Sequence, residues 1–347
     1  MKDYKKIYQL QDKKYIEELC ESVHYMQKIR SYPEEFDMPI TLQFELLAEC
    51  NLHCKHCYNC SGEQKNKTLM TVEKWKDLSE HIVSHGGIFQ CILSGGEPLL
   101  LGDSLFDIMD ILHDDGTSFV LITNGYLLDK EKATRLAKYR YYWLQVSIDG
   151  DCSALHDDFR QVQGSWERAV RGAFEVSNNG IPLVIAHTVT PDTLYRVPQM
   201  ADLAYQLGAT SLMVGQVLPS GRANQYSKEI LLNTDQENSM YEQIEKLRKE
   251  YNGKLEIQRS STLKNQFDRY KVGPNIGAII RPNGDVRLDC MAPFVMGNIL
   301  KTPLYDIWQG KGKRIWENKE VLNFIDSVDE EKQVGNIMNY VDPDVRI

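Results

Sequence analysis

The distribution of hydrophobic residues along the chain predicts an alternation of β-strands and helices. Six short runs rich in β-branched, aliphatic and aromatic residues are typical of strands. They cover residues 40–47, 88–93, 119–123, 143–148, 183–189 and 211–217. Between them, apolar residues recur with the spacing of amphipathic helices at residues 71–85, 105–114, 130–139, 165–178 and 197–207. Consecutive βα units with right-handed connections predict a parallel α/β sheet or barrel.

The N-terminal part of the chain precedes this alternation. Residues 12–30 predict an amphipathic helix, because apolar residues recur at helical spacing from Ile16 to Met26, and Pro33 ends the pattern. We expect this N-terminal helical extension, residues 1–37, to pack against the rest of the chain rather than to contact a partner or a substrate.

The C-terminal part, residues 223–347, follows a different pattern from the βα core of residues 38–222. Residues 235–251 predict a helix, and Asn283-Gly284 between two apolar runs predicts a β-hairpin. The chain therefore divides into a helical extension, a βα core and a C-terminal domain.

Composition narrows the function classes. The chain has 347 residues and a formal net charge of -9, which argues against a nucleic-acid partner or an anionic membrane surface, since either would need a broad basic face. No segment approaches the roughly 20 apolar residues of a membrane span. Eight cysteines, three of them clustered, fit a reducing compartment and metal chemistry better than a disulfide framework. We expect a cytoplasmic protein.

The clustered cysteines are Cys50, Cys54 and Cys57, directly after the first predicted strand. Thiolates at this spacing can converge on a soft metal centre. Iron-sulfur clusters usually take four cysteines, so a loop with three leaves one iron open to an exogenous ligand. The alternative is a zinc knuckle completed by another side chain of the loop. The candidates for that fourth ligand are Cys60, His53 and His56.

A second motif, Gly95-Gly96-Glu97-Pro98, follows the second predicted strand. Two glycines let a ligand lie against the backbone, and proline stiffens the chain beyond the glutamate. Together with the cysteine loop, this segment resembles the radical S-adenosylmethionine (SAM) superfamily, whose signature is Cx3CxΦC followed by a GGEP-like motif. His56 stands at the Φ position, which is usually aromatic. With both motifs in place, the resemblance disfavours the zinc knuckle.

The resemblance implies a fold and a set of ligand contacts. The fold is a partial (β/α)6 TIM barrel, with the motifs at the carboxyl ends of its strands. In this family the three cysteines hold one 4Fe-4S cluster, SAM chelates the open iron, and the backbone and carboxylate of the GGEP motif hold the SAM amino group. Further expected SAM contacts are Asn124, Ser147, Asp149 and, through its backbone, Val214. For Asn124 and Asp149 an ordinary turn is the competing interpretation.

Two further side chains follow the fourth predicted strand. His156 and Arg160 belong to a pattern that recurs in relatives with a SPASM extension, and we expect them to fix a loop rather than to perform catalysis. His187, inside the fifth predicted strand, has a hydrogen-bonded core histidine as its default interpretation.

The C-terminal region resembles the α+β SPASM or twitch extension of radical SAM peptide maturases. It carries a hairpin with the pattern I-x-P-x-G-D-V, then Cys290, then Gly-Asn-Ile and a helix with Ile-Trp. Those extensions use several cysteines to hold auxiliary clusters, whereas Cys290 is the only cysteine after Cys152. We therefore expect the scaffold of such a domain without a cysteine-bound auxiliary cluster.

The resemblance predicts reductive cleavage of SAM to a 5'-deoxyadenosyl radical, which takes a hydrogen atom from a ribosomally synthesised precursor peptide. Epimerisation, cross-linking or a related change would follow, with flavodoxin or ferredoxin as the class of external electron donor. Cys290, or Cys152, is a candidate hydrogen donor, against the alternative of an inert buried cysteine. Two other functions stay open. They are a radical SAM decarboxylase or dehydrogenase acting on a small molecule or haem precursor, and a non-catalytic metal-binding or peptide-binding protein.

Overall fold

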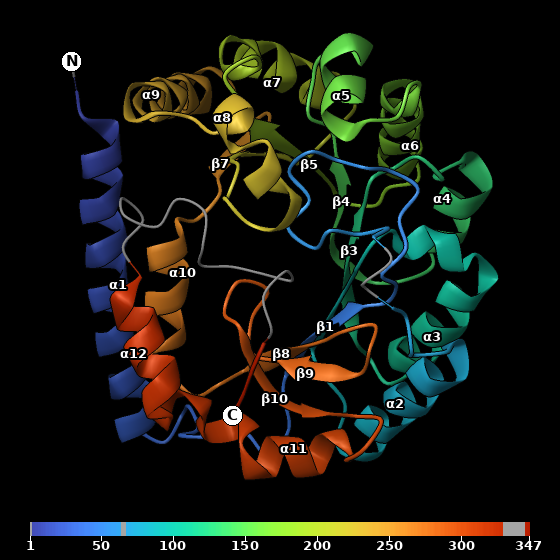
Figure 1. Ribbon diagram of the computed structural model, residues 1–347, viewed down its shortest axis with the longest axis vertical. Coiled ribbons are helices and arrows are strands. Elements are labelled where there is room, and N and C mark those ends of the chain that lie inside the picture. The colour runs from blue at the N-terminus through green and yellow to red at the C-terminus, as the bar shows by residue number, and fades with distance from the viewer. Residues whose placement is uncertain (1, 64–66, 329–343) are drawn as a thin grey trace.

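The computed structural model describes residues 2–63, 67–328 and 344–347. Its centre is one mixed sheet of eleven strands in the order β11-β10-β9-β8-β1-β2-β3-β4-β5-β6-β7 (Figure 1). The strands are β1 Thr41–Glu45, β2 Gln90–Ser94, β3 Ser118–Thr123, β4 Tyr141–Ser147, β5 Leu183–Val189, β6 Ser211–Gln216, β7 Glu256–Arg259, β8 Gly277–Ile280, β9 Asp285–Arg287, β10 Phe294–Asn298 and β11 Val345–Arg346.

The six predicted strands are present as β1 to β6, each parallel to the next. The sheet continues on both sides beyond what the sequence pattern predicts. β7 pairs in parallel with β6, and β8 pairs in parallel with β1. Among the described strands β7 and β11 are the two ends of the order, so the sheet is open, as expected for a partial barrel.

Helices cover the outer side of this sheet (Figure 1). The main ones are α1 Tyr4–Lys28, α2 Val72–Ser84, α3 Asp103–Asp114, α4 Lys130–Leu136, α5 Ser153–Arg160, α6 Ser165–Asn178, α7 Val197–Gln206, α9 Thr234–Glu250, α10 Leu263–Tyr270, α11 Leu304–Gly310 and α12 Lys319–Ser327. Short helical turns are η1 Pro98–Leu101, η2 Leu194–Arg196, η3 Gly221–Gln225, α8 Ser227–Ile230 and η4 Gly312–Glu317. The sequence pattern does not predict α5, and α1 begins earlier than expected because the Asp3 side chain caps it by accepting from the Lys6 amide.

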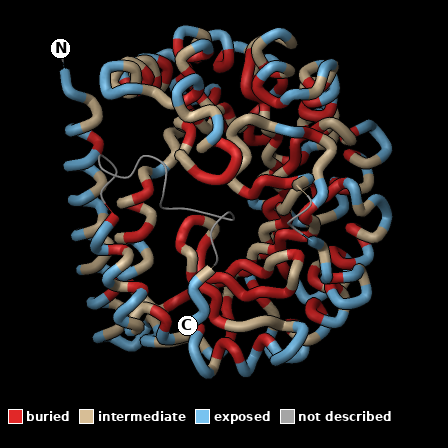
Figure 2. Tube along the Cα trace, viewed as in Figure 1, coloured by how far each residue is buried: buried red, intermediate tan, exposed pale blue. Residues whose placement is uncertain are grey.

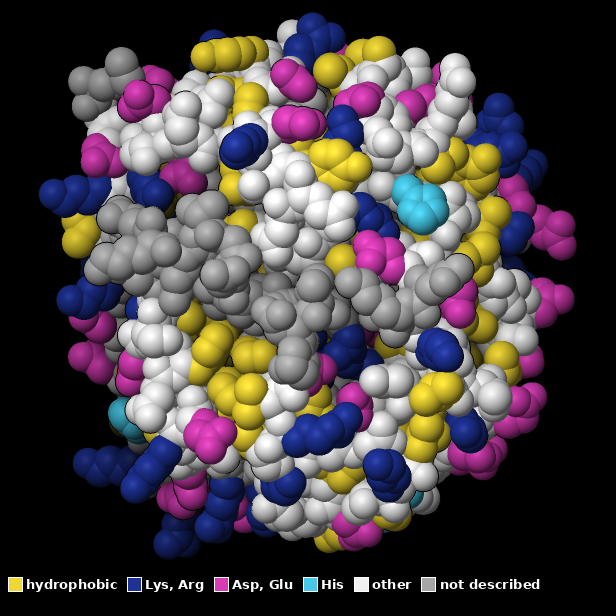
Figure 3. Space-filling model, viewed as in Figure 1, with side chains coloured by type: hydrophobic (Ala, Val, Ile, Leu, Met, Phe, Trp, Pro, Cys, Tyr) yellow, Lys and Arg dark blue, Asp and Glu magenta, His cyan; other side chains and the backbone are white. Residues whose placement is uncertain are grey.

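The core lies between the strands and the inner faces of the helices. In α2, Thr71 caps the first turn, and Trp75, Leu78 and Ile82 are buried at helical spacing. Figure 2 shows the same division throughout, with buried strands and exposed outer helix faces. On the face seen in Figure 3, Lys and Arg side chains are interspersed with Asp and Glu.

The N-terminal helix α1 packs along α9 and α10, as expected for this extension. Asp12 of α1 forms an ion pair with Arg259 at the end of β7, and Tyr8 donates a hydrogen bond to Glu245 of α9. The guanidinium of Arg259 also lies over the Tyr8 ring, with its central carbon 4.3 Å from the ring centroid. α1 therefore covers helices beside the open edge at β7. No helix in the described residues has the length and apolar character to cross a bilayer.

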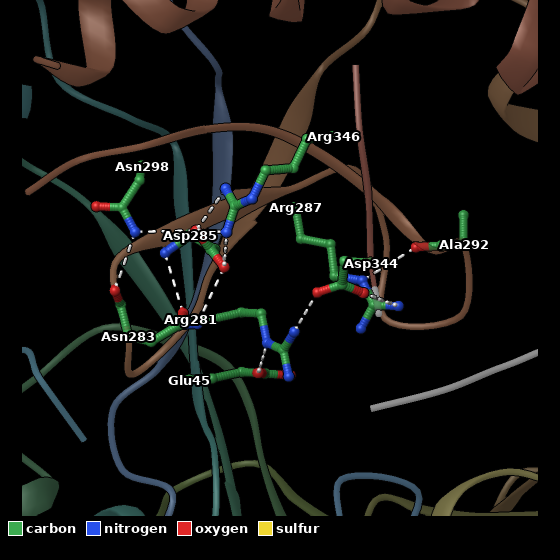
Figure 4. A network of polar contacts seen from close by, with 9 residues as sticks. All are labelled: Glu45, Arg281, Asn283, Asp285, Arg287, Ala292, Asn298, Asp344 and Arg346. Carbon is green, nitrogen blue, oxygen red and sulfur yellow. Dashed lines mark hydrogen bonds and ion pairs between the residues drawn. The ribbon is translucent and has the colours of Figure 1, made fainter. Parts of the chain in front are cut away.

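The C-terminal hairpin is tied together by a buried polar network (Figure 4). Asp285 accepts hydrogen bonds from the Asn283 and Asn298 side chains at 3.0 and 2.9 Å, and from Arg346 of β11 at 3.1 Å. A Cβ on Gly297 would stand 2.9 Å from the Ile307 side chain of α11. The Gly-Asp-Val and Gly-Asn-Ile motifs thus close the hairpin and seat α11 against it.

The same network links the C-terminal region to the core. Arg281 pairs with Asp344 at 2.5 Å, and its Nε lies 3.9 Å from the Glu45 carboxylate at the end of β1. Arg287 is fully buried, pairs with Asp344 at 3.2 Å and donates to the Ala292 carbonyl at 3.0 Å. The boundary expected at residue 222 stays a prediction, and the sheet runs across it.

Candidate active site

The cysteine loop leaves the carboxyl end of β1, where its turns are held by its own main chain. The Cys57 amide donates to the Cys54 carbonyl at 3.2 Å, and the Cys60 amide donates to the Cys57 carbonyl at 3.3 Å. Two sulfur atoms also accept main-chain hydrogen bonds. Cys50 Sγ accepts from Leu52 at 3.5 Å, and Cys57 Sγ accepts from Ser61 at 3.4 Å. Such donors favour a thiolate over a thiol.

Electrostatics place the three predicted ligands beside one another. Burial is the main cause that raises the pKa of Cys54 to about 12. The nearby Cys57 and Cys50 contribute to this rise, and the charge of Arg160 opposes it. Burial likewise raises the pKa of Cys50 to about 11, again with a contribution from Cys57. The Cys50 and Cys54 thiols, beside Cys57, form a site that a metal centre can deprotonate, since a coordinating thiol loses its proton outright.

The loop does not have the geometry of a site for one ion. Among the residues that the structure describes, no three His, Cys, Asp or Glu side chains converge where a single metal ion could sit. A zinc knuckle needs four ligands around one ion. A 4Fe-4S cluster makes a different demand, because each cysteine binds its own iron. The three thiols therefore fit the cluster better than the zinc alternative.

The glycines of the second motif fit against the start of the cysteine loop. A Cβ on Gly96 would stand 1.8 Å from the Glu49 carbonyl oxygen, and one on Gly95 would stand 2.8 Å from the Leu47 carbonyl oxygen. Gly95 also has a φ of +129°, which favours glycine. Because glycine has no side chain, Gly95 and Gly96 leave room for residues 47–49, a role that the sequence did not indicate. Contact of these glycines with SAM stays a prediction.

Glu97 braces two strands rather than pointing into open space. It is buried, and its carboxylate accepts hydrogen bonds from the Thr123 hydroxyl at 2.7 Å, the Asn124 amide at 2.8 Å and the Leu99 amide at 3.1 Å. Burial raises its pKa, and these donors oppose the rise. Protein donors engage both carboxylate oxygens, and the expected contact of this carboxylate with SAM stays a prediction. Pro98 is buried at the start of η1.

Asn124 forms a turn and also contacts the cysteine loop, and its expected contact with SAM stays a prediction. Its side-chain carbonyl accepts from the Tyr126 amide at 2.9 Å, which is the turn. Its amide nitrogen donates to the Asn51 side chain at 2.8 Å and lies 3.8 Å from Cys50 Sγ, which is the site. The end of β3 is thereby fastened to the cysteine loop.

Asp149 forms a buried ion pair, and its expected contact with SAM stays a prediction. One carboxylate oxygen accepts from Arg160 Nε at 2.8 Å and pairs with its Nη2 at 2.6 Å, and the other accepts from the Thr188 amide at 2.8 Å. Burial alone would raise the pKa of Asp149, but the charge of Arg160 outweighs it and holds that pKa well below its usual range. Both partners come from other elements, so these hydrogen bonds are not those of an aspartate turn. Ser147 is half-buried at the end of β4.

Val214 lies in β6 beside a strand that the sequence pattern does not predict. Its side chain is buried in the main core, and its carbonyl accepts from the Ser260 amide at 2.9 Å. This bond exists because β7 pairs with β6. The expected adenine contact through the backbone of Val214 stays a prediction.

The end of α5 holds the cysteine loop through main-chain carbonyls, whereas the side chains of His156 and Arg160, which were expected to fix a loop, bond Asp149. The carbonyls of Phe159 and Arg160, at the end of α5, accept from the amides of Lys55 and His53 at 2.9 and 3.2 Å. His56 stacks on Phe159 with 4.4 Å between ring centroids and 8° between planes. α5 is thus a platform for the cysteine loop.

Two buried histidines stand near the same ion pair. The ring of His156 accepts from the Asp149 amide at 3.1 Å, and burial lowers its pKa to about 3. His187 differs from its default interpretation, because neither ring nitrogen has a hydrogen-bond partner among the residues that the structure describes. Burial lowers its pKa as well, which favours the neutral ring.

A cavity of about 480 Å³ opens at the carboxyl ends of β5, β6 and β7. Neutral polar side chains line it, among them Thr188, Gln258, Ser260 and Gln266. Its size is within the range of small-molecule sites. It adjoins the predicted cofactor region, because Thr188 is the residue whose amide binds Asp149.

Cys290 lies next to a hydrogen-bonded cluster that reaches this cavity. Its neighbour Asp289 accepts hydrogen bonds from the Tyr270 hydroxyl at 2.5 Å and from Gln266 Nε2 at 2.9 Å. Cys290 Sγ is 3.9 Å from the Asp289 carboxylate. Burial raises the pKa of Cys290 well above its usual range, and the charges of Asp289 and Glu45 raise it further, so the thiol keeps its hydrogen.

Models of two protein families match two segments of the chain. Residues 45–204 match the radical SAM superfamily, and residues 273–333 match SPASM, described as an iron-sulfur cluster-binding domain. These two segments are a radical SAM domain and a SPASM domain. The radical SAM superfamily uses a 4Fe-4S cluster and SAM, and the prediction of a radical SAM enzyme with a SPASM domain is confirmed.

Relatives of known activity include both peptide and haem enzymes. The chain is 35% identical to an AdoMet-dependent heme synthase of Methanosarcina barkeri over 54% of this chain and 53% of that protein. It is 30% identical to the mycofactocin maturase MftC of Mycolicibacterium smegmatis over 62% of this chain and 54% of that protein. It is 27% identical to the subtilosin biosynthesis protein AlbA of Bacillus subtilis over 82% of this chain and 64% of that protein. The matches to the first two span about half of each relative.

Solved structures confirm the fold. SuiB of Streptococcus suis bound to S-adenosylmethionine aligns with a TM-score of 0.65 and 17% identity, covering 84% of this chain and 68% of that chain. The enzyme anSMEcpe with bound AdoMet aligns with a TM-score of 0.63 and 18% identity, covering 84% of this chain and 85% of that chain. The predicted partial barrel with a SPASM-type domain is therefore correct.

Proposed function

We propose that Cys50, Cys54 and Cys57 hold a single 4Fe-4S cluster in this radical SAM enzyme, with SAM at the open iron. The observation that supports this most directly is the loop itself, which gathers three thiols and gives two of them main-chain donors. When bound, the cluster and SAM supply the electron and the radical. The chain's own part is to orient the cysteines through Asn124 and α5 and to keep water from the reacting carbon.

The proposal includes only one cluster. Cys290 is the only cysteine within residues 273–333, so the matched SPASM region cannot supply a cysteine set for an auxiliary cluster. We expect about four iron atoms per chain after anaerobic reconstitution. A flavodoxin or ferredoxin is the proposed class of electron donor.

The proposed substrate is a ribosomally synthesised peptide, which the enzyme alters after hydrogen abstraction by epimerisation, cross-linking or a related change. The cavity at β5–β7 supports this choice, because its amide and hydroxyl side chains suit the uncharged donors and acceptors of a peptide backbone. The names of MftC and AlbA agree with it.

A haem precursor is the second candidate, supported by the similarity to heme synthases. A tetrapyrrole carries several carboxylates, which would need free cations in the pocket. Arg259 is the one Lys or Arg among the described residues that line this cavity, and Asp12 of α1 already neutralises it. The lining therefore favours the peptide.

The test of this function is anaerobic turnover with dithionite and SAM. We expect 5'-deoxyadenosine to form, and its rate to rise with the cognate peptide and not with porphyrin precursors. Mass spectrometry in heavy water then separates the outcomes, since uptake of one deuterium marks epimerisation and loss of two hydrogens marks oxidation or cross-linking. Absence of SAM binding and of 5'-deoxyadenosine with every substrate would contradict an enzymatic role.

Replacing Cys290 with alanine tests the proposed hydrogen donor. In that role its S–H bond breaks as a C–H bond forms on the substrate radical, and the thiyl radical left behind takes one electron from the external donor and one proton from solvent. We expect Cys290→Ala to form 5'-deoxyadenosine while deuterium uptake from heavy water falls by about tenfold or more. Cys91→Ala is the matched control, because Cys91 is fully buried in β2. Unchanged product from Cys290→Ala would remove this thiol from the mechanism.

A further inference from the structure

The segment that follows β6 reaches back and binds the cysteine loop. Arg222 is buried in the turn η3, and three of its donors meet three carbonyls of the loop. Its main-chain amide donates to Cys57 at 2.9 Å, Nη1 donates to Cys54 at 3.0 Å, and Nη2 donates to Ser61 at 2.8 Å. Two of these carbonyls belong to proposed cluster ligands.

Gly221 permits this approach. Its φ is +57°, and a Cβ there would stand 2.2 Å from the Tyr58 carbonyl oxygen and 2.6 Å from the Cys57 carbonyl oxygen. Real side chains do not tolerate such contacts, so any other residue would push η3 and the loop apart. Gly221 and Arg222 thus support the same contact between η3 and the cysteine loop. Gly221 leaves space for the loop, and Arg222 donates hydrogen bonds to it.

Helix α5 bonds the hydrogen-bond donors of the same loop, whereas Arg222 bonds its acceptors. α5 offers carbonyls to loop amides, whereas Arg222 offers donors to loop carbonyls. The two supports also touch, because Phe159 of α5 packs with Val217, Ala223 and Ile230 in a small apolar cluster separate from the main core. The cysteine loop is therefore bonded by α5 and by the segment after β6, which pack against each other although they are about 60 residues apart in the sequence.

We propose that Gly221 and Arg222 are positioning residues that hold the cysteine loop in the shape that binds the cluster. Fixing the Cys54 and Cys57 carbonyls fixes the peptide planes on which the two Cβ–Sγ bonds are mounted. Arginine suits this role because its planar group donates in several fixed directions at once, which an ammonium group cannot do. The inference rests on the cluster ligands assigned under the proposed function.

The test compares Arg222→Gln with Arg248→Gln in the full-length, reconstituted enzyme. Arg248 is the matched control, because it also donates to a main-chain carbonyl, that of Ile257 at 2.8 Å, and pairs with a carboxylate, but it lies on α9. We expect Arg222→Gln to lose iron to a chelator at least about tenfold faster than wild type, as the loss of charged hydrogen bonds implies. The rate of iron loss from Arg222→Lys should lie between those of wild type and Arg222→Gln. The rate from Arg248→Gln should match that of wild type.

Amide hydrogen exchange provides a readout that a general loss of stability would not reproduce. In Arg222→Gln, we expect faster exchange confined to the loop between Cys50 and Ser61, with α1 and α9 unchanged. Gly221→Ala, which keeps the arginine, should give the same pattern. Iron release within about twofold of wild type in both variants, or exchange that rises evenly across the protein, would overturn the proposal.

The two proposals can fail separately. If wild type took up no iron, the ligand assignment would be wrong, and amide exchange in the cluster-free protein would still test the positioning role of Gly221 and Arg222. If wild type bound a stable cluster and both variants kept it, only this positioning role would be wrong.

Discussion

Replacing Cys54 with serine is expected to abolish cluster binding and SAM cleavage. Cys54 is the thiol whose pKa responds to both Cys50 and Cys57, which places it among all three proposed ligands. A hydroxyl remains protonated where a thiolate is needed, so the cluster would lose one of only three protein ligands. We expect iron content to fall close to zero and the rate of 5'-deoxyadenosine formation to fall on the order of a thousandfold, measured by iron analysis and anaerobic chromatography.

Cys60→Ser is the control that gives this result its meaning. Cys60 is in the same loop, is buried and could complete a zinc knuckle, but its own raised pKa comes from burial, then from Glu63 and Cys57. We expect this variant to keep its iron and its activity. Equal loss in Cys54→Ser and Cys60→Ser would favour a four-ligand site and would contradict the proposed cluster geometry.

The sequence predicted the parts of this fold that depend on local pattern. The apolar runs of β1 to β6 are long and bounded by turns, and the spacing from Cys50 to Cys57 carries its chemistry without reference to the rest of the chain. The short strand β7 gives a weaker signal, because four residues with one buried side chain show no clear period. Because β7 was not predicted, the hydrogen bond that the Val214 carbonyl accepts from Ser260, the residue after β7, was not foreseen.

The hydrogen-bond partners of the polar side chains could not be predicted, because sequence position shows which residues lie at a strand end and not which other groups contact them. Asp149 and Glu97 stand at the ends of β4 and β2, where SAM was expected. Their oxygens are satisfied by Arg160, Thr123 and main-chain amides that come from other elements. A buried carboxylate needs such partners, so burial itself predicts competition for these groups.

Gly221 and Arg222 were missed for the same reason. A glycine and an arginine after a strand are common in loops, and nothing local indicates that both face a loop 160 residues earlier. The partner of Arg222 Nη1, the carbonyl of Cys54, is 168 residues away in the chain. Only the folding of the βα series brings the segment after β6 near the loop that follows β1.

Replacing Arg160 with methionine is expected to destabilise the cluster-free protein by about 3–5 kcal/mol at neutral pH. The guanidinium is buried with the fully buried Asp149, so the variant leaves a carboxylate without its counter-charge. Anaerobic urea unfolding measures the loss. Arg196→Met is the control, because Arg196 pairs with Asp151 through a side chain that is 44% exposed, where screening leaves at most about 1 kcal/mol.

The pH dependence identifies the cause of that loss. In wild type the depressed pKa of Asp149 gives stability that is present above the unfolded pKa and is lost only at lower pH. Without Arg160, burial would raise that pKa, so the folded variant would take up a proton as pH falls. The gap in unfolding free energy between wild type and Arg160→Met should therefore narrow from pH 7 to pH 5, by up to about 1.4 kcal/mol per pH unit. Adding Asp149→Asn should restore part of the stability at pH 7 and remove most of this narrowing. A gap that is constant with pH, or a double variant whose loss is the sum of the single losses, would mean that the arginine acts through packing and not through its charge.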